Sequence, residues 1–188
     1  MNHKTKTMVG IGLFTAIVMV LQFLGGSIRF GVFSISLVLV PIVVGAAVYG
    51  WKAGAWLGFM FGVAVLLSGD AAAFMVVHPL GTVLTVLAKG AACGLVAGFV
   101  YHLFAKKNKF LAVLAAALIC PVVNTGVFLV GCVLFFLETV AEWGRALGYE
   151  NVANYMFLGL AGGNFLVEVA VNLLLAPVIV RLIAIGKK

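Results

Sequence analysis

Six long runs of apolar residues constrain the fold more than any other feature of the sequence. They cover residues 8–24, 34–50, 53–68, 80–104, 110–137 and 157–185. A helix needs about 20 apolar residues to cross the hydrocarbon core of a bilayer. Since 65% of the residues are hydrophobic and only 9% are charged, we predict an all-α, polytopic membrane protein. The expected architecture is a bundle of six transmembrane helices, forming a single integral membrane domain over residues 1–188.

The distribution of lysine and arginine predicts the orientation of this bundle. Six crossings return the chain to its starting side, and that side holds nine of the twelve basic residues: Lys4, Lys6, Lys52, Lys106, Lys107, Lys109, Arg181, Lys187 and Lys188. Cytoplasmic loops are enriched in basic residues, so both termini are expected in the cytoplasm. Inner loops beside anionic lipid also explain the net charge of +7, and no nucleic-acid partner is expected.

Two charged residues lie deep inside the apolar runs, far from the ends of the runs. Lys89 is deep in the run 80–104, and Glu168 is the only carboxylate in the run 157–185. A charge at the centre of a bilayer costs roughly 2.5–3.5 kcal/mol, which makes each residue a candidate for function. At the helical rise per residue, both lie roughly 13–17 Å below the outer helix ends. We therefore expect Lys89 and Glu168 to line one cavity that opens to the outside.

Polar residues at helical spacing extend from both charges. They are His78, Thr82 and Thr85 with Lys89 along the fourth helix, and Asn164 and Asn172 with Glu168 along the sixth. Asn124, three residues after Pro121 in the fifth run, is a third polar point. Residues three or four positions apart share one face of a helix. A few polar groups among apolar walls are typical of a small-molecule site. The alternative is a buried structural ion pair, with the Asn and Thr side chains bonding between helices.

The two longest outward loops, Gly25–Phe33 and Glu138–Met156, are open to two interpretations. They could close as lids over an outward cavity, or they could be ordinary solvated connections with an interfacial Trp143. Arg29 and Arg145 are the basic residues on this side. Arg29 is included among the expected substrate contacts because it could meet an anion.

Small residues recur at every fourth position in three of the runs. Gly50, Gly54, Gly58 and Gly62 follow this spacing into the third helix, Gly90, Gly94 and Gly98 in the fourth, and Gly12 and Ala16 in the first. Such ridges allow helices to approach closely. They indicate either packing inside the bundle or a surface for a partner helix, and the pair in the first run is the one expected to face lipid.

Sequence motifs for catalysis or cofactor binding are not found. The sequence has no GxxxxGK[ST] phosphate loop, no HExxH and no GxSxG. Cys93, Cys120 and Cys132 have neither CxxC nor histidine spacing, so we interpret them as packing residues rather than as metal ligands or disulfides. We expect no cofactor, no metal and no enzymatic activity, but a binding subunit that depends on partners for energy.

One stretch carries a family resemblance. It is Leu37 to Gly62, LVLVPIVVGAAVYGWKAGAWLGFMFG, followed by Asp70 and by PLGTVLTVLAKG from Pro79 to Gly90. With the six short spans, it resembles the substrate-binding S components of bacterial energy-coupling factor (ECF) vitamin transporters. The resemblance implies a multi-pass protein of the bacterial cytoplasmic membrane, which binds a small vitamin and works with a transmembrane coupling subunit and two cytoplasmic ATPases. It also implies that the S component reorients bodily in the membrane.

The resemblance assigns further roles to individual residues. The AxxxA coupling motif of the family's first helix maps onto Gly12 and Ala16, with glycine replacing the first alanine. Pantothenate is the first candidate ligand, because its carboxylate could pair with Lys89 and its hydroxyls and amide with Glu168, Asn164 and Asn124. Riboflavin or another vitamin remains open.

Two functions of other classes also remain open. One is a small ion-coupled carrier or channel, in which Lys89 and Glu168 relay protons or gate ions. The other is a membrane enzyme that uses an acid, a lysine and His78 for acid–base chemistry.

Overall fold

The computed structural model describes residues 2–27, 29–30, 33–34 and 37–186, and most of them are helical. Among these described residues, five segments are long and apolar enough to cross a membrane. They are α1 (His3–Ser27), α3 (Trp51–Ser68), α5 (Pro79–Ala105), α6 (Lys109–Phe135) and the run of α8 (Val152–Asn154), η1 (Tyr155–Leu160) and α9 (Gly162–Leu174). The predicted fold class, a polytopic helical bundle, is confirmed. The described strands, β1 (Arg29–Phe30) and β2 (Phe33–Ser34), form one short antiparallel pair.

Helix α2 (Leu39–Tyr49) is shorter than the span expected over 34–50. Its 11 residues extend only about 16 Å, roughly half the thickness of the hydrocarbon core. The helix is apolar on all sides because it is buried among neighbouring helices, with contacts to α1, α3, α5, α6 and α10 (Ala176–Gly186). The length of the apolar run therefore reflects burial inside the bundle rather than a complete crossing.

The last expected span, 157–185, is divided into three helical pieces. The π-helix η1 precedes α9, and α9 ends at Leu174, just before α10 begins. The break falls at Leu175, two residues before Pro177. Proline has no backbone N–H and its ring collides with the preceding turn, so the helical hydrogen-bond ladder is interrupted at this point.

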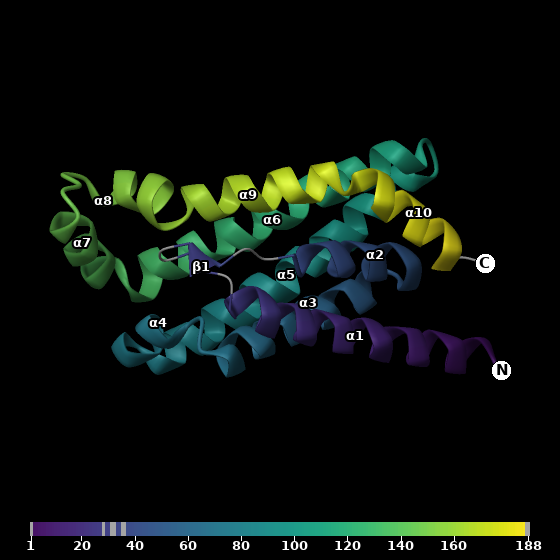
Figure 1. The fold of residues 1–188 in the computed structure, drawn as a ribbon, viewed down its shortest axis with the longest axis horizontal. Coiled ribbons are helices and arrows are strands. Elements are labelled where there is room, and N and C mark those ends of the chain that lie inside the picture. The colour runs from purple at the N-terminus through teal and green to yellow at the C-terminus, as the bar shows by residue number, and fades with distance from the viewer. Residues whose placement is uncertain (1, 28, 31–32, 35–36, 187–188) are drawn as a thin grey trace.

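The glycine ridges of α3 and α5 pack against each other. A Cβ atom on Gly62 would lie 2.8 Å from the carbonyl oxygen of Val86, and one on Gly58 would overlap the carbonyl of Gly90. Only glycine allows the two backbones to approach this closely. The interpretation of these ridges as packing inside the bundle is confirmed, and the helices lie side by side in Figure 1.

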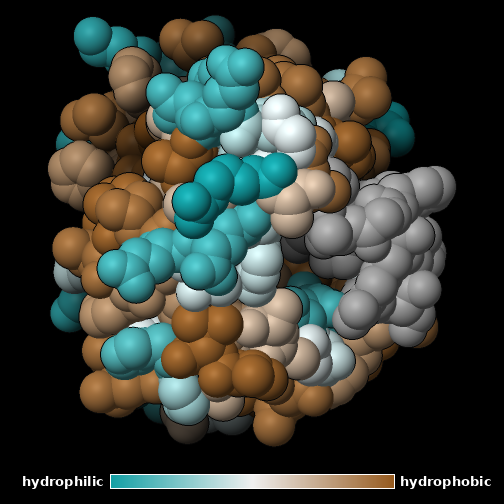
Figure 2. Space-filling model, turned by 90° about the vertical axis from the view of Figure 1, so that its left-hand side faces the viewer, coloured by the Kyte–Doolittle hydropathy of each residue, from teal (hydrophilic) through white to brown (hydrophobic). Residues whose placement is uncertain are grey.

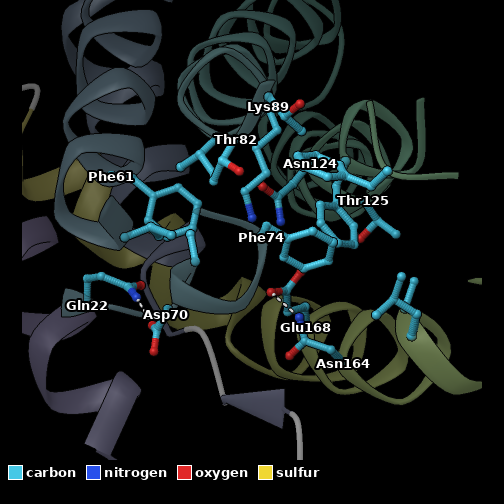
Figure 3. A pocket seen from close by; sticks show the side chains of 18 residues that line it. Gln22, Phe61, Asp70, Phe74, Thr82, Lys89, Asn124, Thr125, Asn164 and Glu168 are labelled. Atoms are coloured by element: carbon cyan, nitrogen blue, oxygen red, sulfur yellow. Dashed lines mark hydrogen bonds between the residues drawn. The ribbon is translucent and has the colours of Figure 1, made fainter. Parts of the chain in front are cut away.

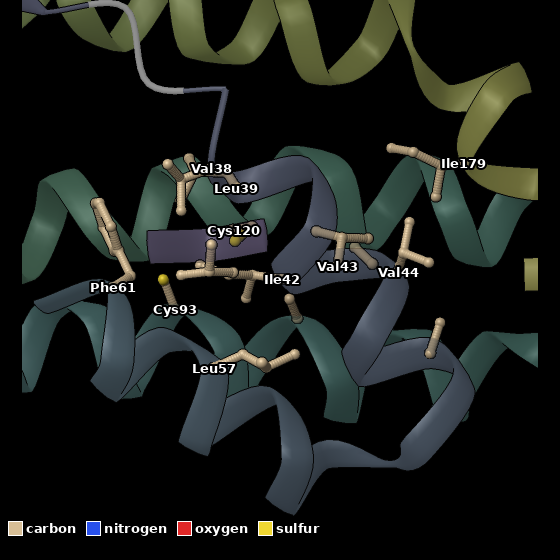
Figure 4. Packing of buried hydrophobic residues seen from close by; sticks show 14 of the residues in the cluster. Val38, Leu39, Ile42, Val43, Val44, Leu57, Phe61, Cys93, Cys120 and Ile179 are labelled. Carbon is tan, nitrogen blue, oxygen red and sulfur yellow. The ribbon is translucent and has the colours of Figure 1, made fainter. Parts of the chain in front are cut away.

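A hydrophobic core lies between α2, α3, α5 and α6. Leu39, Ile42 and Leu57 are fully buried there, and Cys93 and Cys120 fill the space between them (Figure 4). Cys132 is buried in a second cluster with Phe136 and Val140. All three cysteines are thus packing residues, as the sequence predicted.

The two ends of the bundle differ. Both termini lie at one end, as expected for a chain that returns to its starting side, and α4 (Ala72–Val77), α7 (Leu137–Ala146) and α8 lie at the other, which we call the distal end (Figure 1). Hydrophilic side chains gather in the middle of the distal end, with hydrophobic side chains around them (Figure 2). The segment expected as a long outward loop is largely helical, and the Trp143 ring of α7 packs edge-on against Phe74 at 5.4 Å between centroids.

Candidate functional site

A cavity of about 170 Å³ lies in the distal half of the bundle. Its residues come from the C-terminal parts of α1 and α3, from α4, from the N-terminal part of α5, from α6, and from η1 and α9. The apolar wall is rich in aromatic rings, namely Phe61, Phe74, Phe128 and Phe136. Polar side chains from several helices point into the space between these rings (Figure 3).

The ammonium group of Lys89 projects into the cavity between two rings. Lys89 is ten residues into α5, which places it about 15 Å from the distal end of that helix. Its Nζ lies 5.6 Å from the centroid of Phe61 and 5.5 Å from that of Phe128. Each cation–π contact contributes roughly 0.5–2 kcal/mol, more when water is excluded. The two rings therefore hold the cation in place while it remains accessible from the cavity.

Glu168 faces the cavity from α9, with only 2% of its surface exposed. Its Oε1 accepts a hydrogen bond of 3.0 Å from Nδ2 of Asn164, one turn earlier. Its Oε2 is buried and, within the described part of the chain, has no hydrogen-bond partner. Glu168 and Lys89 therefore line one cavity, and no hydrogen bond between these two described residues is found.

Three buried oxygen atoms on three helices lack partners around this cavity. They are Thr85 Oγ1 on α5, Asn124 Oδ1 on α6 and Glu168 Oε2 on α9, considering the residues that the structure describes. Leaving a buried polar group without a hydrogen bond costs about 1–3 kcal/mol, so such groups are rare in folded proteins. Their convergence on one cavity that also contains a lysine is the arrangement expected of a site for a small polar molecule.

A comparison with protein families identifies the chain. The family model for "ECF transporter, substrate-specific component" matches residues 6–180. The chain belongs to this family. No curated protein and no solved structure gave a match. As an S component, the chain is a membrane-embedded transporter subunit and not an enzyme. Such subunits associate with the membrane and ATPase subunits of an ECF transporter and bind a small-molecule substrate.

Six of the residues predicted for the substrate site of this S component line the cavity. They are Lys89, Glu168, Asn164, Asn124, Thr85 and Thr82. Thr82 also donates a hydrogen bond of 3.0 Å from Oγ1 to the carbonyl oxygen of His78. The polar residues that the sequence places on separate helices therefore line one cavity.

The other three predicted substrate contacts are not among the residues that line the described cavity. His78 is exposed at the N-cap of α5, where its Nδ1 accepts a hydrogen bond of 2.9 Å from the Gly81 N–H. Asn172 is buried one turn beyond Glu168 and donates from Nδ2 to the Glu168 carbonyl oxygen at 2.9 Å. Arg29 belongs to β1, and its side chain lies outside the described residues.

Sequence reasoning missed the aromatic wall and one polar pair. Aromatic residues inside apolar runs resemble ordinary core residues, so Phe61 and Phe128 gave no signal of their own. Gln22 and Asp70 also line the cavity and are joined by a hydrogen bond from Gln22 Nε2 to Asp70 Oδ2. The signal that could have found Gln22 is that it is the only amide side chain in the first apolar run.

The predicted docking pair lies on the outer surface of α1. Gly12 and Ala16 are exposed, and a Cβ atom on Gly12 would meet no described atom within 4 Å. The neighbouring Leu13 is 61% exposed. This small-residue face of α1 is therefore accessible to lipid or to another helix.

Proposed function

We propose that this S component binds a small vitamin with high affinity and delivers it to an ATP-driven ECF importer. Pantothenate is the first candidate substrate, and riboflavin or another vitamin is the alternative. The observation that carries this proposal is the cavity, in which Lys89 and three buried oxygens without a partner among the described residues surround a space of about 170 Å³.

The chemistry of pantothenate complements these groups. Its carboxylate is an anion for the Lys89 ammonium. Its hydroxyls and amide N–H are donors for Glu168 Oε2 and Asn124 Oδ1, which have no hydrogen-bond partner in the described part of the chain. Because drug-sized ligands occupy pockets of roughly 300–1,000 Å³, the smaller volume here favours pantothenate over the larger riboflavin.

The partners belong to the same proposal. The exposed face with Gly12 and Ala16 lets another helix approach closely, and we assign it to the transmembrane coupling subunit. Two cytoplasmic ATPases would then supply the energy. The positive-inside distribution favours cytoplasmic termini, and with that orientation the cavity, in the half away from the termini, would face the outside.

Substitution of Lys89 tests this assignment. We expect Lys89→Met to weaken binding of radiolabelled pantothenate to the purified chain by about 2 kcal/mol or more, roughly 30-fold, because the ligand carboxylate loses a charged partner. Lys106→Met, which removes an exposed lysine at the C-cap of α5, is the matched control and should bind as tightly as the wild type. Equal affinity of the wild type and Lys89→Met would refute the role of Lys89.

An ion-coupled carrier is the rival function, since Lys89 and Glu168 line one intramembrane cavity. A charged pair inside a membrane is also typical of proton relays. Liposomes that contain this chain alone separate the two. The proposed function predicts vitamin binding without proton flux, whereas proton flux that is independent of a vitamin and lost in Glu168→Gln would favour the carrier.

A further inference from the structure

One face of α6 runs along the part of α5 that carries Lys89. On this face lie Phe128, Gly131 and Phe135, at helical spacing. Phe128 contacts Lys89, with 5.5 Å between its ring centroid and Nζ. Gly131 lies one turn closer to the distal end and faces Thr85, which is one turn before Lys89 on α5. The α6 face therefore presents two aromatic rings with a gap between them, and the gap lies opposite a residue of the cavity.

The side chain of Thr85 fills the gap at Gly131. Both residues are buried. A Cβ atom on Gly131 would overlap Cγ2 and Oγ1 of Thr85 and would lie 2.9 Å from its Cβ. Because Cβ does not move when the Thr85 side chain rotates, rotation alone does not relieve this contact. Any side chain at position 131 therefore has to displace Thr85 from α6.

The direction of this displacement matters for the cavity. Thr85 lines the cavity, whereas Gly131 is not among the described residues that line it. Thr85 thus lies between the α6 backbone and the cavity, and a shift away from α6 is a shift toward the cavity. Thr85 is also on the distal side of Lys89, so a ligand that enters from the distal end passes Thr85 before it reaches the ammonium group.

We propose that Gly131 is a positioning residue for the ligand of this cavity. Its missing side chain lets Thr85 lie back against α6, which keeps the cavity wide enough beside Lys89 for an anionic group and the chain attached to it. A larger residue at position 131 would narrow this passage without touching the ligand. This inference rests on the proposed function, because it assumes that the transported molecule binds at Lys89.

Alanine substitutions at two glycines of the same helix pair test this proposal. Gly131→Ala should weaken pantothenate binding to the purified chain at least about tenfold, the lower end of the effect of one carbon in a ligand pocket. Gly81→Ala is the matched control, because its Cβ atom would lie 2.7 Å from Cγ of Phe135 in the same α5–α6 contact, and neither residue is among those that line the described cavity. It should lower the melting temperature and leave the affinity within twofold. Equal losses of affinity in both variants would identify separation of the helices as the cause and would refute the proposal.

Removal of the Thr85 side chain tests whether Gly131 acts through it. Thr85→Gly removes the three atoms nearest to the added carbon. In this background Gly131→Ala should change the affinity less than twofold, because the effects of residues in contact are not additive. A tenfold loss that persists in the Thr85→Gly background would show that Gly131 acts through another residue, and it would overturn the proposal.

A measurement without ligand separates this inference from the proposed function. Formaldehyde with a borohydride reductant methylates amines, and mass spectrometry follows the rate at Lys89 relative to the exposed Lys106. Gly131→Ala should slow methylation of Lys89 several-fold, whereas Gly81→Ala should leave the rate unchanged. If the wild type does not bind pantothenate, the assignment of pantothenate fails, and the methylation rate still decides the role of Gly131. Equal rates at Lys89 in the wild type and in Gly131→Ala would refute that role.

Discussion

Replacing Gly58 by alanine tests how closely α3 and α5 pack. The added Cβ atom would overlap the carbonyl oxygen of Gly90 and lie 2.7 Å from its carbonyl carbon. Both are backbone atoms, so only a separation of the helices relieves the overlap. Overpacking a core costs roughly 1–3 kcal/mol, and the higher helix propensity of alanine offsets about 0.5–1 kcal/mol. We expect a net loss of about 1–2 kcal/mol.

For a chain of this size, each kcal/mol lowers the melting temperature by roughly 2–4 °C. A thiol-reactive dye measures the transition in detergent, because all three cysteines are buried and react only on unfolding. Gly12→Ala is the matched control, a helical glycine with no described atom within 4 Å of the added carbon, and it should melt at or above the wild-type temperature. If Gly58→Ala is as stable as the wild type, or if both variants lose the same stability, the packing argument is refuted.

Two further substitutions separate the stability of the bundle from its ligand site. His78→Ala removes the acceptor for the Gly81 N–H at the start of α5. Because loss of an N-cap costs about 1 kcal/mol, the melting temperature should fall while pantothenate affinity stays within twofold. A large loss of affinity would show that His78 belongs to the ligand site. Thr85→Val replaces a buried hydroxyl without a described partner by a methyl group of similar shape. The protein without ligand should become more stable by up to about 1 kcal/mol, and it should bind pantothenate more weakly. Lower stability in the same dye assay would show that the hydroxyl has a hydrogen-bond partner within the bundle.

The sequence predicted the charged part of the site well, because charges are costly in a membrane. Lys89 and Glu168 stand out against apolar runs, and helical spacing is enough to connect them to Thr85 and Asn164. Their meeting in one cavity depends only on two helices facing each other in a small bundle. The packing role of the glycine ridges was equally predictable, because glycines at regular spacing in a membrane helix usually allow another helix to approach closely.

The features that the sequence did not predict depend on which residues pack together in the folded bundle. Hydropathy does not distinguish a helix buried by its neighbours from one that crosses the membrane, so the short length of α2 was not predictable. The same ambiguity hides the aromatic wall, because Phe61 and Phe128 have the same hydropathy whether they face lipid, core or a cavity. His78 followed the stripe by spacing, but its place at the N-cap of α5 turns the ring toward the helix start.

Ligand-induced stabilisation of the purified chain tests the central claim most directly. The chain in detergent would be melted with each vitamin of a panel that includes pantothenate and riboflavin, for the wild type and for Lys89→Met. Ligand at several hundred times its Kd stabilises a protein by about 3–4 kcal/mol. We predict a shift of this size for the wild type with one vitamin, pantothenate, and a much smaller shift for Lys89→Met. No shift with any vitamin would contradict the assignment of this cavity as a vitamin-binding site.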